Sequence, residues 1–304
     1  MPMRPLTCGL TAYHRPRTDK VQNITKLRQF VKKIAPLYWL VGFARYLNFR
    51  RHLRTANLAH KTEANATAVP PMLRYRVHGA LDAHSYVEGG RSIASCLVKY
   101  AKAQAIELSD ATILDFACGP GRIAVELKKI VPSCRLYGSD IDGEAIAWAQ
   151  GHLVGLGVFT TNEATPPTKY ASNTFDVIYS ISLFTHLDET SQNLWLAELA
   201  RILKPGGTLL TTIHGDFARA SCTPDELKEL DRHGIAFRVD RKGKFKLDGL
   251  PDFYQTTFHT QAYVARVWSG FFEVVEHIDG GLGQHQDLVL LKRRTPIEAV
   301  KIIV

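Results

Sequence analysis

The stretch from Ile113 to Ala124, with the sequence ILDFACGPGRIA, constrains the fold of this chain more than any other. An apolar pair precedes Asp115, a glycine-rich turn follows, and apolar residues then recur at helical spacing. This succession predicts a strand, a tight loop and a helix, which present backbone N–H groups and a helix N-terminus to a ligand. Gly119 and Gly121 allow positive φ and a close approach of the main chain to a bound molecule. The sequence therefore predicts a ligand site on this loop.

Strand and helix patterns alternate around and beyond this loop, which predicts a parallel, doubly wound sheet. The expected strands are 113–116, 135–139, 158–161 (weak), 175–180 and 207–213, and the expected helices are 122–130, 143–153 and 191–203. A helix at 260–271 then leads to strands 273–278 and 287–292, joined by a Gly280-Gly281 loop, which predicts an antiparallel hairpin at the end. The expected fold class is α/β, a Rossmann-like doubly wound sheet with mostly parallel strands and a C-terminal antiparallel hairpin. An N-terminal helical extension and a lid insertion complete the predicted architecture.

The positive charge of the chain belongs to its N-terminal part. Residues 1–61 hold thirteen Lys and Arg and one acid, Asp19, so they carry +12 of a net charge of +9, and the remainder is −3. We therefore expect a basic helical extension over 1–70 and a catalytic domain over 71–304, with a lid at about 216–257. The core domain is therefore not basic, which disfavours nucleic acid as the partner.

The extension shows a helical pattern from Val21 to Leu58 that is broken near Pro36 and combines aromatic with basic residues. Two interpretations stay open: a helical layer packed on the core domain, or an amphipathic helix within 21–61 on an anionic membrane surface. Leu73–Val77 predicts an extended segment. Gly89-Gly90-Arg91 predicts the start of a helix, either as an N-terminus that holds a carboxylate or as a turn before a packing helix.

The glycine loop formally fits the G-x-G-x-x-G/A pattern of NAD-binding domains, and Asp140 follows at the expected interval. Three features count against NAD. Pro120 removes one N–H from the turn that would hold a pyrophosphate, and Asp115 would repel the phosphates. The closing hairpin belongs to a different sheet topology. A cationic nucleoside ligand would instead be attracted to Asp115.

Four motifs in order resemble those of class I S-adenosylmethionine-dependent methyltransferases. They are Leu114–Arg122, Gly138–Asp142, Phe175–Ser182 and Leu203–Thr208. The resemblance extends over roughly residues 73 to 293. Three shorter stretches resemble a bacterial subgroup that acts on small molecules and glycans: Phe184–Leu187, Trp195–Leu199 and Gln286–Val289.

The resemblance implies which residues hold S-adenosylmethionine, whose product after methyl transfer is S-adenosylhomocysteine. Asp115, Ala117, Gly119 and Gly121 would line its methionine part, and the family usually has glycine where this chain has Ala117. Asp140 would accept both ribose hydroxyls, and Ile141 would pack on adenine. Asn162 or Glu163 would receive the adenine amine. Ser180, Ile181 and Ser182 would lie beside the sulfonium.

Candidate bases follow the strands at the carboxyl edge of the sheet, where open α/β sheets bind ligands. His186 and His214 come first because histidine titrates in the useful range. Asp188 is the third candidate in this region, and the lid adds Tyr254 and His259. The twelve histidines show no i, i+4 pair typical of a metal site, and the five cysteines have no metal spacing, so we expect no metal.

We therefore expect an S-adenosylmethionine-dependent methyltransferase that acts on a small molecule or glycan, with O-methylation favoured. The alternatives are a catalytically silent cofactor-binding accessory module and an NAD-dependent Rossmann enzyme. The expected location is the cytoplasm, with peripheral contact at the inner membrane face through residues 21–61. The sequence names neither the methyl acceptor nor the oligomeric state.

Overall fold

The computed structural model describes residues 35–62 and 68–294, except 241, 244, 245 and 284. Its centre is a seven-stranded sheet with the order β3-β2-β1-β4-β5-β9-β8. The strands are β1 (Thr112–Phe116), β2 (Arg135–Asp140), β3 (Val158–Thr161), β4 (Phe175–Ser180), β5 (Leu203–Ile213), β8 (Glu273–Leu282) and β9 (Gln286–Lys292). The first five pair in parallel, whereas β9 is antiparallel to β5 and to β8. The predicted fold class, with its closing hairpin, is confirmed.

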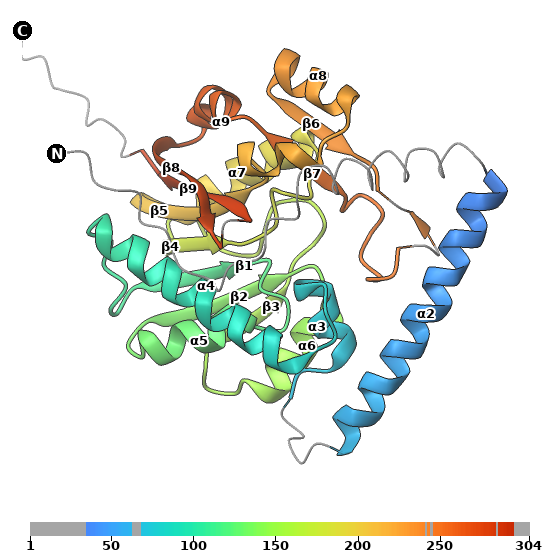
Figure 1. Cartoon of the computed structure of the whole chain (residues 1–304). Helices are drawn as coiled ribbons and strands as arrows, with labels where there is room; N and C mark the ends of the chain where they lie inside the picture. The colour runs from blue at the N-terminus through green and yellow to red at the C-terminus, as the bar shows by residue number, and fades with distance from the viewer. Residues whose placement is uncertain (1–34, 63–67, 241, 244–245, 284, 295–304) are drawn as a thin grey trace, which may run out of the picture.

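Helices cover both faces of the sheet (Figure 1). They are α3 (Pro71–His78), α4 (Ala83–Ala103), α5 (Arg122–Ile130), α6 (Gly143–His152), α7 (Glu189–Ile202) and α9 (Gln261–Val267). Successive strand residues point to opposite faces, so Ile113 packs in a core with α4, α5 and α6, while Leu114 packs in a second core with α7 and α9. The same alternation separates Leu288 and Leu290 from Val289 and Leu291 on β9. Both faces of the central strands are therefore buried, as a parallel sheet requires.

The start of α4 corrects the expectation for Gly89-Gly90-Arg91. The helix begins six residues earlier at Ala83, because Asp82 caps it by accepting a hydrogen bond from the N–H of Ser85 at 2.6 Å. Gly90 lies inside α4, where an added Cβ would stand 2.6 Å from the carbonyl oxygen of Arg122. The glycine permits close packing of α4 on α5, so the predicted carboxylate-binding N-terminus at this position is wrong.

The segment Leu73–Val77 is also helical rather than extended, because it lies within α3. Pro71 stands in the first turn of α3, where a missing N–H costs nothing, and Gly79 ends the helix in the left-handed conformation. This short helix packs against two neighbouring helices, α2 (Ala35–Thr62) and α4. Propensity over so few residues did not reveal it.

The predicted lid contains regular structure that its sequence did not reveal. It holds η1 (Asp216–Ser221), α8 (Pro224–His233), β6 (Ile235–Arg238) and the start of β7 (Thr256–His259). Strands β6 and β7 form an antiparallel pair although seventeen residues of chain separate them, so no local turn signal marked the hairpin. We call residues 239–255, the connection between β6 and β7, the lid loop.

In the N-terminal extension, α2 begins at Ala35, immediately before Pro36, and continues to Thr62. Ala35 is also the first described residue, so the predicted break near Pro36 stays a prediction. The part of the predicted helix from 21 to 34 lies outside the described residues. Among the residues that the structure describes, no helix combines the length and the apolarity needed to cross a membrane.

Candidate functional site

A cavity of about 1390 Å³ opens at the carboxyl edge of the parallel strands, between the glycine loop and the lid loop. It is larger than the roughly 300–1,000 Å³ of a typical small-molecule site, so it has room for two ligands side by side. Eleven of the predicted site residues line it: Ala117, Gly119, Asp140, Ile141, Asn162, Glu163, Ile181, Ser182, His186, His214 and Tyr254. The fold thus collects residues at the ends of β1, β2, β3, β4 and β5, together with Tyr254 of the lid loop, at one edge.

The glycine loop is held open by unusual backbone conformations. Ala117, Gly119 and Gly121 have φ values of 66°, 53° and 82°. Gly119 also needs to be glycine for space, because an added Cβ would stand 2.4 Å from Cγ1 of Val77 on α3. Ala117 adopts the left-handed conformation without glycine's freedom, at a cost of about 1–2 kcal/mol. This is where the chain departs from the glycine usual in the family.

Asp140 ties the end of β2 to the glycine loop. Its Oδ2 accepts a hydrogen bond from the N–H of Gly119 at 2.6 Å, and its Oδ1 accepts one from the N–H of Asp142 at 2.8 Å. Each carboxylate oxygen keeps a second lone pair, so the group can still receive two hydroxyls. Burial raises the pKa of Asp140.

Asp115 lies beneath the loop and does not line the cavity. Burial raises its pKa to about 7, and the neighbouring Asp140 carboxylate adds to the shift. Within the described part of the chain, its Oδ2 is buried without a hydrogen-bond partner. Two acidic groups so close together under one loop favour a cationic ligand over a phosphate, which supports S-adenosylmethionine as a fit for the residues present.

Gly121 and Ser180 also lie behind the cavity wall. Gly121 caps α5, with an added Cβ 2.7 Å from Cδ1 of Leu153, so its role is in the loop's geometry. Ser180 is fully buried at the end of β4, where its carbonyl accepts a hydrogen bond from Oγ1 of Thr211 at 2.9 Å. The structure therefore does not place Asp115, Gly121 or Ser180 in the lining, and direct contact of these three with the cofactor stays a prediction.

At the end of β3, both polar ends of the Asn162 side chain already have partners. Its Oδ1 accepts from Oγ of Ser139 at 2.8 Å, and its Nδ2 donates to the carbonyl of Glu163 at 2.7 Å. Asn162 and Glu163 both line the cavity, so the choice between them for the adenine amine stays open.

Ser182 is held by three elements at once. Its N–H donates to Oγ1 of Thr212 on β5 at 2.8 Å, and its hydroxyl contacts the Gln286 amide on β9 at 2.8 and 3.1 Å. Its carbonyl accepts from the hydroxyl of Tyr254 in the lid loop at 2.8 Å. These contacts hold Ser182 at a φ of 61°, a strained conformation that persists only where its surroundings fix it.

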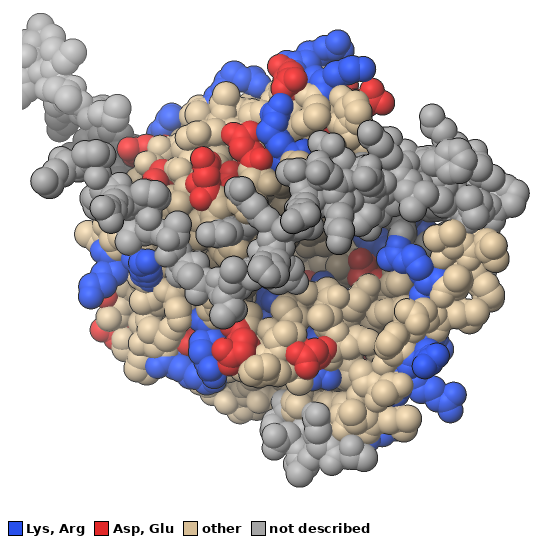
Figure 2. Space-filling model, viewed as in Figure 1, with Lys and Arg blue, Asp and Glu red and all other residues tan. Residues whose placement is uncertain are grey.

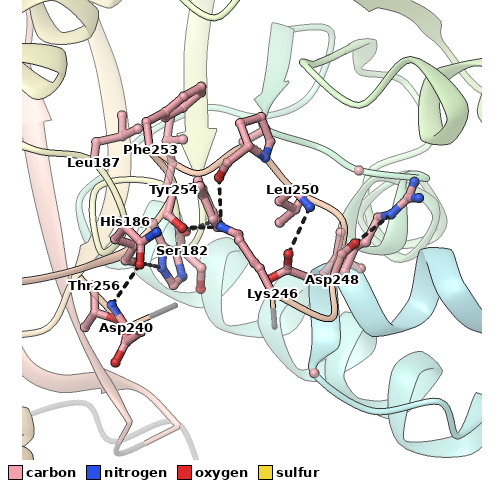
Figure 3. Close-up of a pocket in the computed structure, with 18 of the residues that line it drawn as sticks. Ser182, His186, Leu187, Asp240, Lys246, Asp248, Leu250, Phe253, Tyr254 and Thr256 are labelled. Atoms are coloured by element: carbon pink, nitrogen blue, oxygen red, sulfur yellow. Dashed lines mark hydrogen bonds between the residues drawn. The ribbon is translucent and has the colours of Figure 1, made fainter. Parts of the chain in front are cut away.

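The two candidate bases, His186 and His214, both line the cavity, and Figure 3 shows His186 beside Tyr254. Nδ1 of His186 is hydrogen-bonded to the carbonyl of Gln255, and Nδ1 of His214 to the carbonyl of Thr257 at 3.2 Å. Burial lowers the pKa of both rings, to about 3 for His214. The ring of His186 stacks on Tyr254, with the centroids 4.2 Å apart.

Of the three other proposed bases, Tyr254 lines the cavity, whereas Asp188 and His259 have structural roles. Asp188 caps α7 by accepting from the N–H of Ser191 at 2.8 Å, and His259 is buried with its Nε2 2.9 Å from Oε1 of Gln192. Neither lines the cavity. The predictions of Asp188 and His259 as bases are wrong for the same reason: polar residues near strand ends can also cap helices or pair with other side chains in the core.

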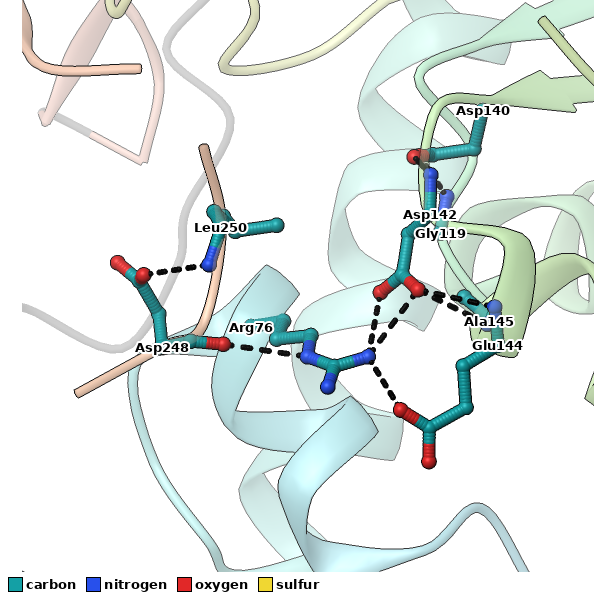
Figure 4. A network of polar contacts seen from close by, with 8 residues as sticks. All are labelled: Arg76, Gly119, Asp140, Asp142, Glu144, Ala145, Asp248 and Leu250. Atoms are coloured by element: carbon teal, nitrogen blue, oxygen red, sulfur yellow. Dashed lines mark hydrogen bonds and ion pairs between the residues drawn. The ribbon is translucent and has the colours of Figure 1, made fainter. Parts of the chain in front are cut away.

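Arg76 of α3 lines the cavity at a position that the sequence did not reveal (Figure 4). Its guanidinium donates to both oxygens of Asp142 at 2.8 and 3.1 Å, pairs with Glu144 at 2.8 Å, and donates from Nε to the carbonyl of Asp248 at 3.1 Å. It thereby joins the end of β2 to the lid loop. Sixty-six residues separate Arg76 from Asp142, so no local pattern could have paired them.

One group of side chains outside the cavity has the spacing of a metal site. A ligand atom from each of His277, Asp279 and Asp287 lies within 4.8 Å of the others. Asp287 already accepts hydrogen bonds from Nε2 of His277 and from the N–H of Gly280. The hydrogen bonds account for the arrangement without an ion.

Comparison with known proteins agrees with this geometry. Residues 113–207 match the family model described as a methyltransferase domain. The ubiquinone/menaquinone biosynthesis C-methyltransferase UbiE of Bdellovibrio bacteriovorus is 36% identical over 121 residues, which cover 39% of this chain and 49% of that protein. The probable methyltransferase ltbC of Aspergillus luteorubrus is 31% identical over 127 residues, which cover 38% of this chain and 45% of that protein.

Solved structures include an S-adenosylmethionine-dependent methyltransferase from Methanosarcina mazei, with a TM-score of 0.46 and 20% identity over 64% of this chain and 98% of that one. The match to each of the two curated relatives spans less than half of that protein's length. The family match covers the glycine loop and the motifs after β2, β4 and α7. The chain therefore contains a methyltransferase domain over residues 113–207, and the curated proteins that it resembles include methyltransferases.

Proposed function

We propose that this protein uses S-adenosylmethionine to O-methylate a small-molecule or glycan acceptor. One observation carries the choice of a hydroxyl acceptor: two partly buried imidazoles line the same cavity as the glycine loop, each with its Nδ1 on a backbone carbonyl. A hydroxyl must lose its proton during methyl transfer, whereas a neutral amine need not lose one before attack. A pair of neutral bases at the cavity wall fits the first requirement.

The protonation state of both rings follows from their partners. A carbonyl oxygen only accepts hydrogen bonds, so each Nδ1 carries the hydrogen and each neutral ring keeps its Nε2 lone pair. Because burial lowers the pKa of both rings, they are neutral at pH 7. Nε2 of His186 can then take the proton from an acceptor hydroxyl, and His214, with its pKa of about 3, is the weaker base of the two.

The remaining residues bind and orient. When bound, S-adenosylmethionine supplies an electrophilic methyl group on its sulfonium. Asp140 would receive the ribose hydroxyls, and the loop around Gly119 would follow the methionine part. Ser182 and Tyr254, joined by a hydrogen bond, line the same cavity as the histidines. Alignment of two ligands in one enclosed cavity can supply roughly 7–11 kcal/mol of barrier reduction at best.

The acceptor half of the cavity carries both apolar and charged groups from the lid loop. Leu250, Pro251 and Phe253 contribute apolar surface, and Lys246 contributes a cation. The ammonium of Lys246 donates to the carbonyls of Pro251 and Tyr254, so it stiffens the loop as well as adding charge. Asp240 and Asp248 of the same loop also line the cavity, so this lining supports an acceptor with an apolar body and a polar part.

Binding and turnover test the proposal separately. Titration of the purified chain with S-adenosylmethionine and with NADH should show micromolar binding of the first alone. A panel of phenols, sugars, amines and carbon acids is then screened for S-adenosylhomocysteine release, because named relatives include C-, N- and O-methyltransferases. Release with hydroxyl acceptors supports the proposal, and preference for an amine or carbon acid contradicts O-methylation. Cofactor binding without turnover on any class would favour a silent accessory module.

A further inference from the structure

Helix α2 presents two different faces. Positions that recur every three or four residues are partly buried and form its inner face: Gly42, Tyr46, Phe49, Leu53, Ala56 and His60. The inner face packs toward α3, where the ring of Phe49 lies 4.6 Å from the ring of Tyr75. Figure 1 shows α2 at the edge of the molecule, with its other side turned away from the sheet.

The outer face carries large apolar side chains in an unusual place. Leu40, Phe43 and Leu47 are 65%, 54% and 51% exposed. A surface helix of a globular protein normally turns its apolar stripe to the core and its polar residues outward. Here the inner face already has its partner, so the outer apolar residues serve something else.

Positive charge accompanies these apolar residues. Residues 35–62 contain five Lys and Arg and no Asp or Glu. Arg50, Arg51 and Arg54 are exposed on the stretch after Leu47. In Figure 2 Lys and Arg side chains appear along the edge where Figure 1 places α2. Apolar side chains among cations, without acids, are the composition of helices that lie on anionic lipid surfaces.

The same helix borders the cavity. Val41 and Arg45 of α2 line it, and across from them Phe237, Val239 and Phe253 line it while remaining 40%, 45% and 41% exposed. The opening therefore has an apolar rim formed by α2 and the lid. An acceptor that enters along this rim meets apolar side chains before it reaches the histidines.

We propose that the outer face of α2 docks on the surface of an anionic lipid bilayer and holds the cavity opening at the lipid. The docking proposal rests on the proposed methyltransferase function and specifies its substrate. The acceptor is an amphiphile that resides in the membrane, with its hydroxyl-bearing head group in the cavity and its apolar chain at the rim. A nucleic acid would use the arginines but gain nothing from Leu40, Phe43 and Leu47, which favours the lipid surface.

Vesicle co-sedimentation of the full chain tests the docking surface. Vesicles of phosphatidylcholine with phosphatidylglycerol should bind the protein, and vesicles of phosphatidylcholine alone should bind it at least about tenfold more weakly. Replacing Arg50, Arg51 and Arg54 with Gln should weaken binding on the order of 100-fold, since each cation near the surface contributes about a factor of five. Replacing Leu40, Phe43 and Leu47 with Ser should weaken it about tenfold or more.

A matched variant controls for net charge. Lys102, Lys129 and Lys228 are exposed on α4, α5 and α8, and their replacement with Gln should leave vesicle binding within about twofold. S-adenosylmethionine affinity, measured for every variant, shows that each remains folded. Docking is refuted if both α2 variants bind vesicles as tightly as the parent does. It is also refuted if only the arginine variant loses vesicle binding and the parent binds RNA as well as it binds vesicles. A third contrary result is that light scattering shows the parent to be a dimer and the serine variant to be a monomer.

The acceptor half of the proposal has its own readout. A phenol carrying a long alkyl chain, embedded in anionic vesicles, should be methylated faster than the same phenol without the chain, and the serine variant should lose this preference. Equal rates would refute a membrane-resident amphiphile. Vesicle binding without cofactor binding would refute the methyltransferase function alone, whereas turnover without vesicle binding would refute the docking alone.

Discussion

The hydroxyl of Tyr254 donates a hydrogen bond to the carbonyl oxygen of Ser182 at 2.8 Å. This contact joins the lid loop to the strained residue that follows β4. The ring of the same tyrosine stacks on His186, and its own carbonyl accepts from Lys246. One side chain therefore links the closure of the cavity, the conformation at its centre and the orientation of a candidate base.

Tyr254→Phe removes the hydrogen bond but keeps the ring. We expect a loss of about 0.5–1.5 kcal/mol in the free energy of unfolding and a lower kcat, because Ser182 and His186 lose a common support. Tyr263→Phe is the matched control. The hydroxyl of Tyr263 donates to Oε1 of Glu189 at 2.8 Å, and neither residue lines the cavity. Urea unfolding and steady-state kinetics measure both variants. An unchanged kcat in Tyr254→Phe, with stability lowered in both, would reduce the contact to a structural one.

His186→Gln and His214→Gln separate the two candidate bases. Loss of the general base should lower kcat by about 10²–10⁴-fold with little change in cofactor affinity. His152→Gln is the control, because its Nδ1 also contacts a carbonyl, that of Trp148, but the ring is exposed and outside the cavity. The assay is S-adenosylhomocysteine release with the best hydroxyl acceptor. If neither variant loses more than the control, the proton leaves by another route.

Asp140→Asn tests the ribose assignment. An amide has one acceptor oxygen, so it cannot accept from both the Gly119 and the Asp142 N–H groups as the carboxylate does. We expect S-adenosylmethionine affinity to fall by at least about tenfold, as for the loss of a charged hydrogen bond. Asp110→Asn, at an exposed position, is the control. Calorimetric titration showing equal affinity for both variants would contradict the assignment.

Asp115→Asn should make the cofactor-free protein more resistant to high pH. Burial raises the pKa of Asp115 to about 7, so the folded state holds this proton more tightly than the unfolded chain, whose aspartate pKa is about 3.9. The stability contributed by Asp115 is present in full below that value and is lost as the pH rises to about 7, by at most about 1.4 kcal/mol per pH unit. Asn has no such loss.

The measurement for this prediction is the difference in unfolding free energy between Asp115→Asn and the parent at pH 5, 6, 7 and 8. The variant should gain relative to the parent up to about pH 7 and then keep a constant difference. The buried histidines act equally in both proteins, so they cancel. A difference that does not change with pH would show that Asp115 is ionised in the folded protein throughout.

The sequence by itself determined the sheet and the loop. Consecutive apolar residues such as Ile113 and Leu114 specify a strand buried on both faces, and the spacing of Gly119, Gly121 and Asp140 specifies a ligand loop at its end. These signals are local, since strand alternation, helical spacing and the positive φ of glycine act within a few residues. For that reason the fold class and the cofactor family could be inferred without coordinates.

Only the tertiary structure decided which residues meet at the site. In the tertiary structure Asp188 caps α7, His259 lies in the core and Asp115 lies beneath the glycine loop. Arg76 contacts both Asp142 and Asp248, which are far from it in sequence. The tertiary structure also turned Gly90 from an expected helix start into a packing position. Each of these outcomes depends on contacts between residues far apart in sequence, and such contacts are fixed by the packing of whole elements rather than by local patterns.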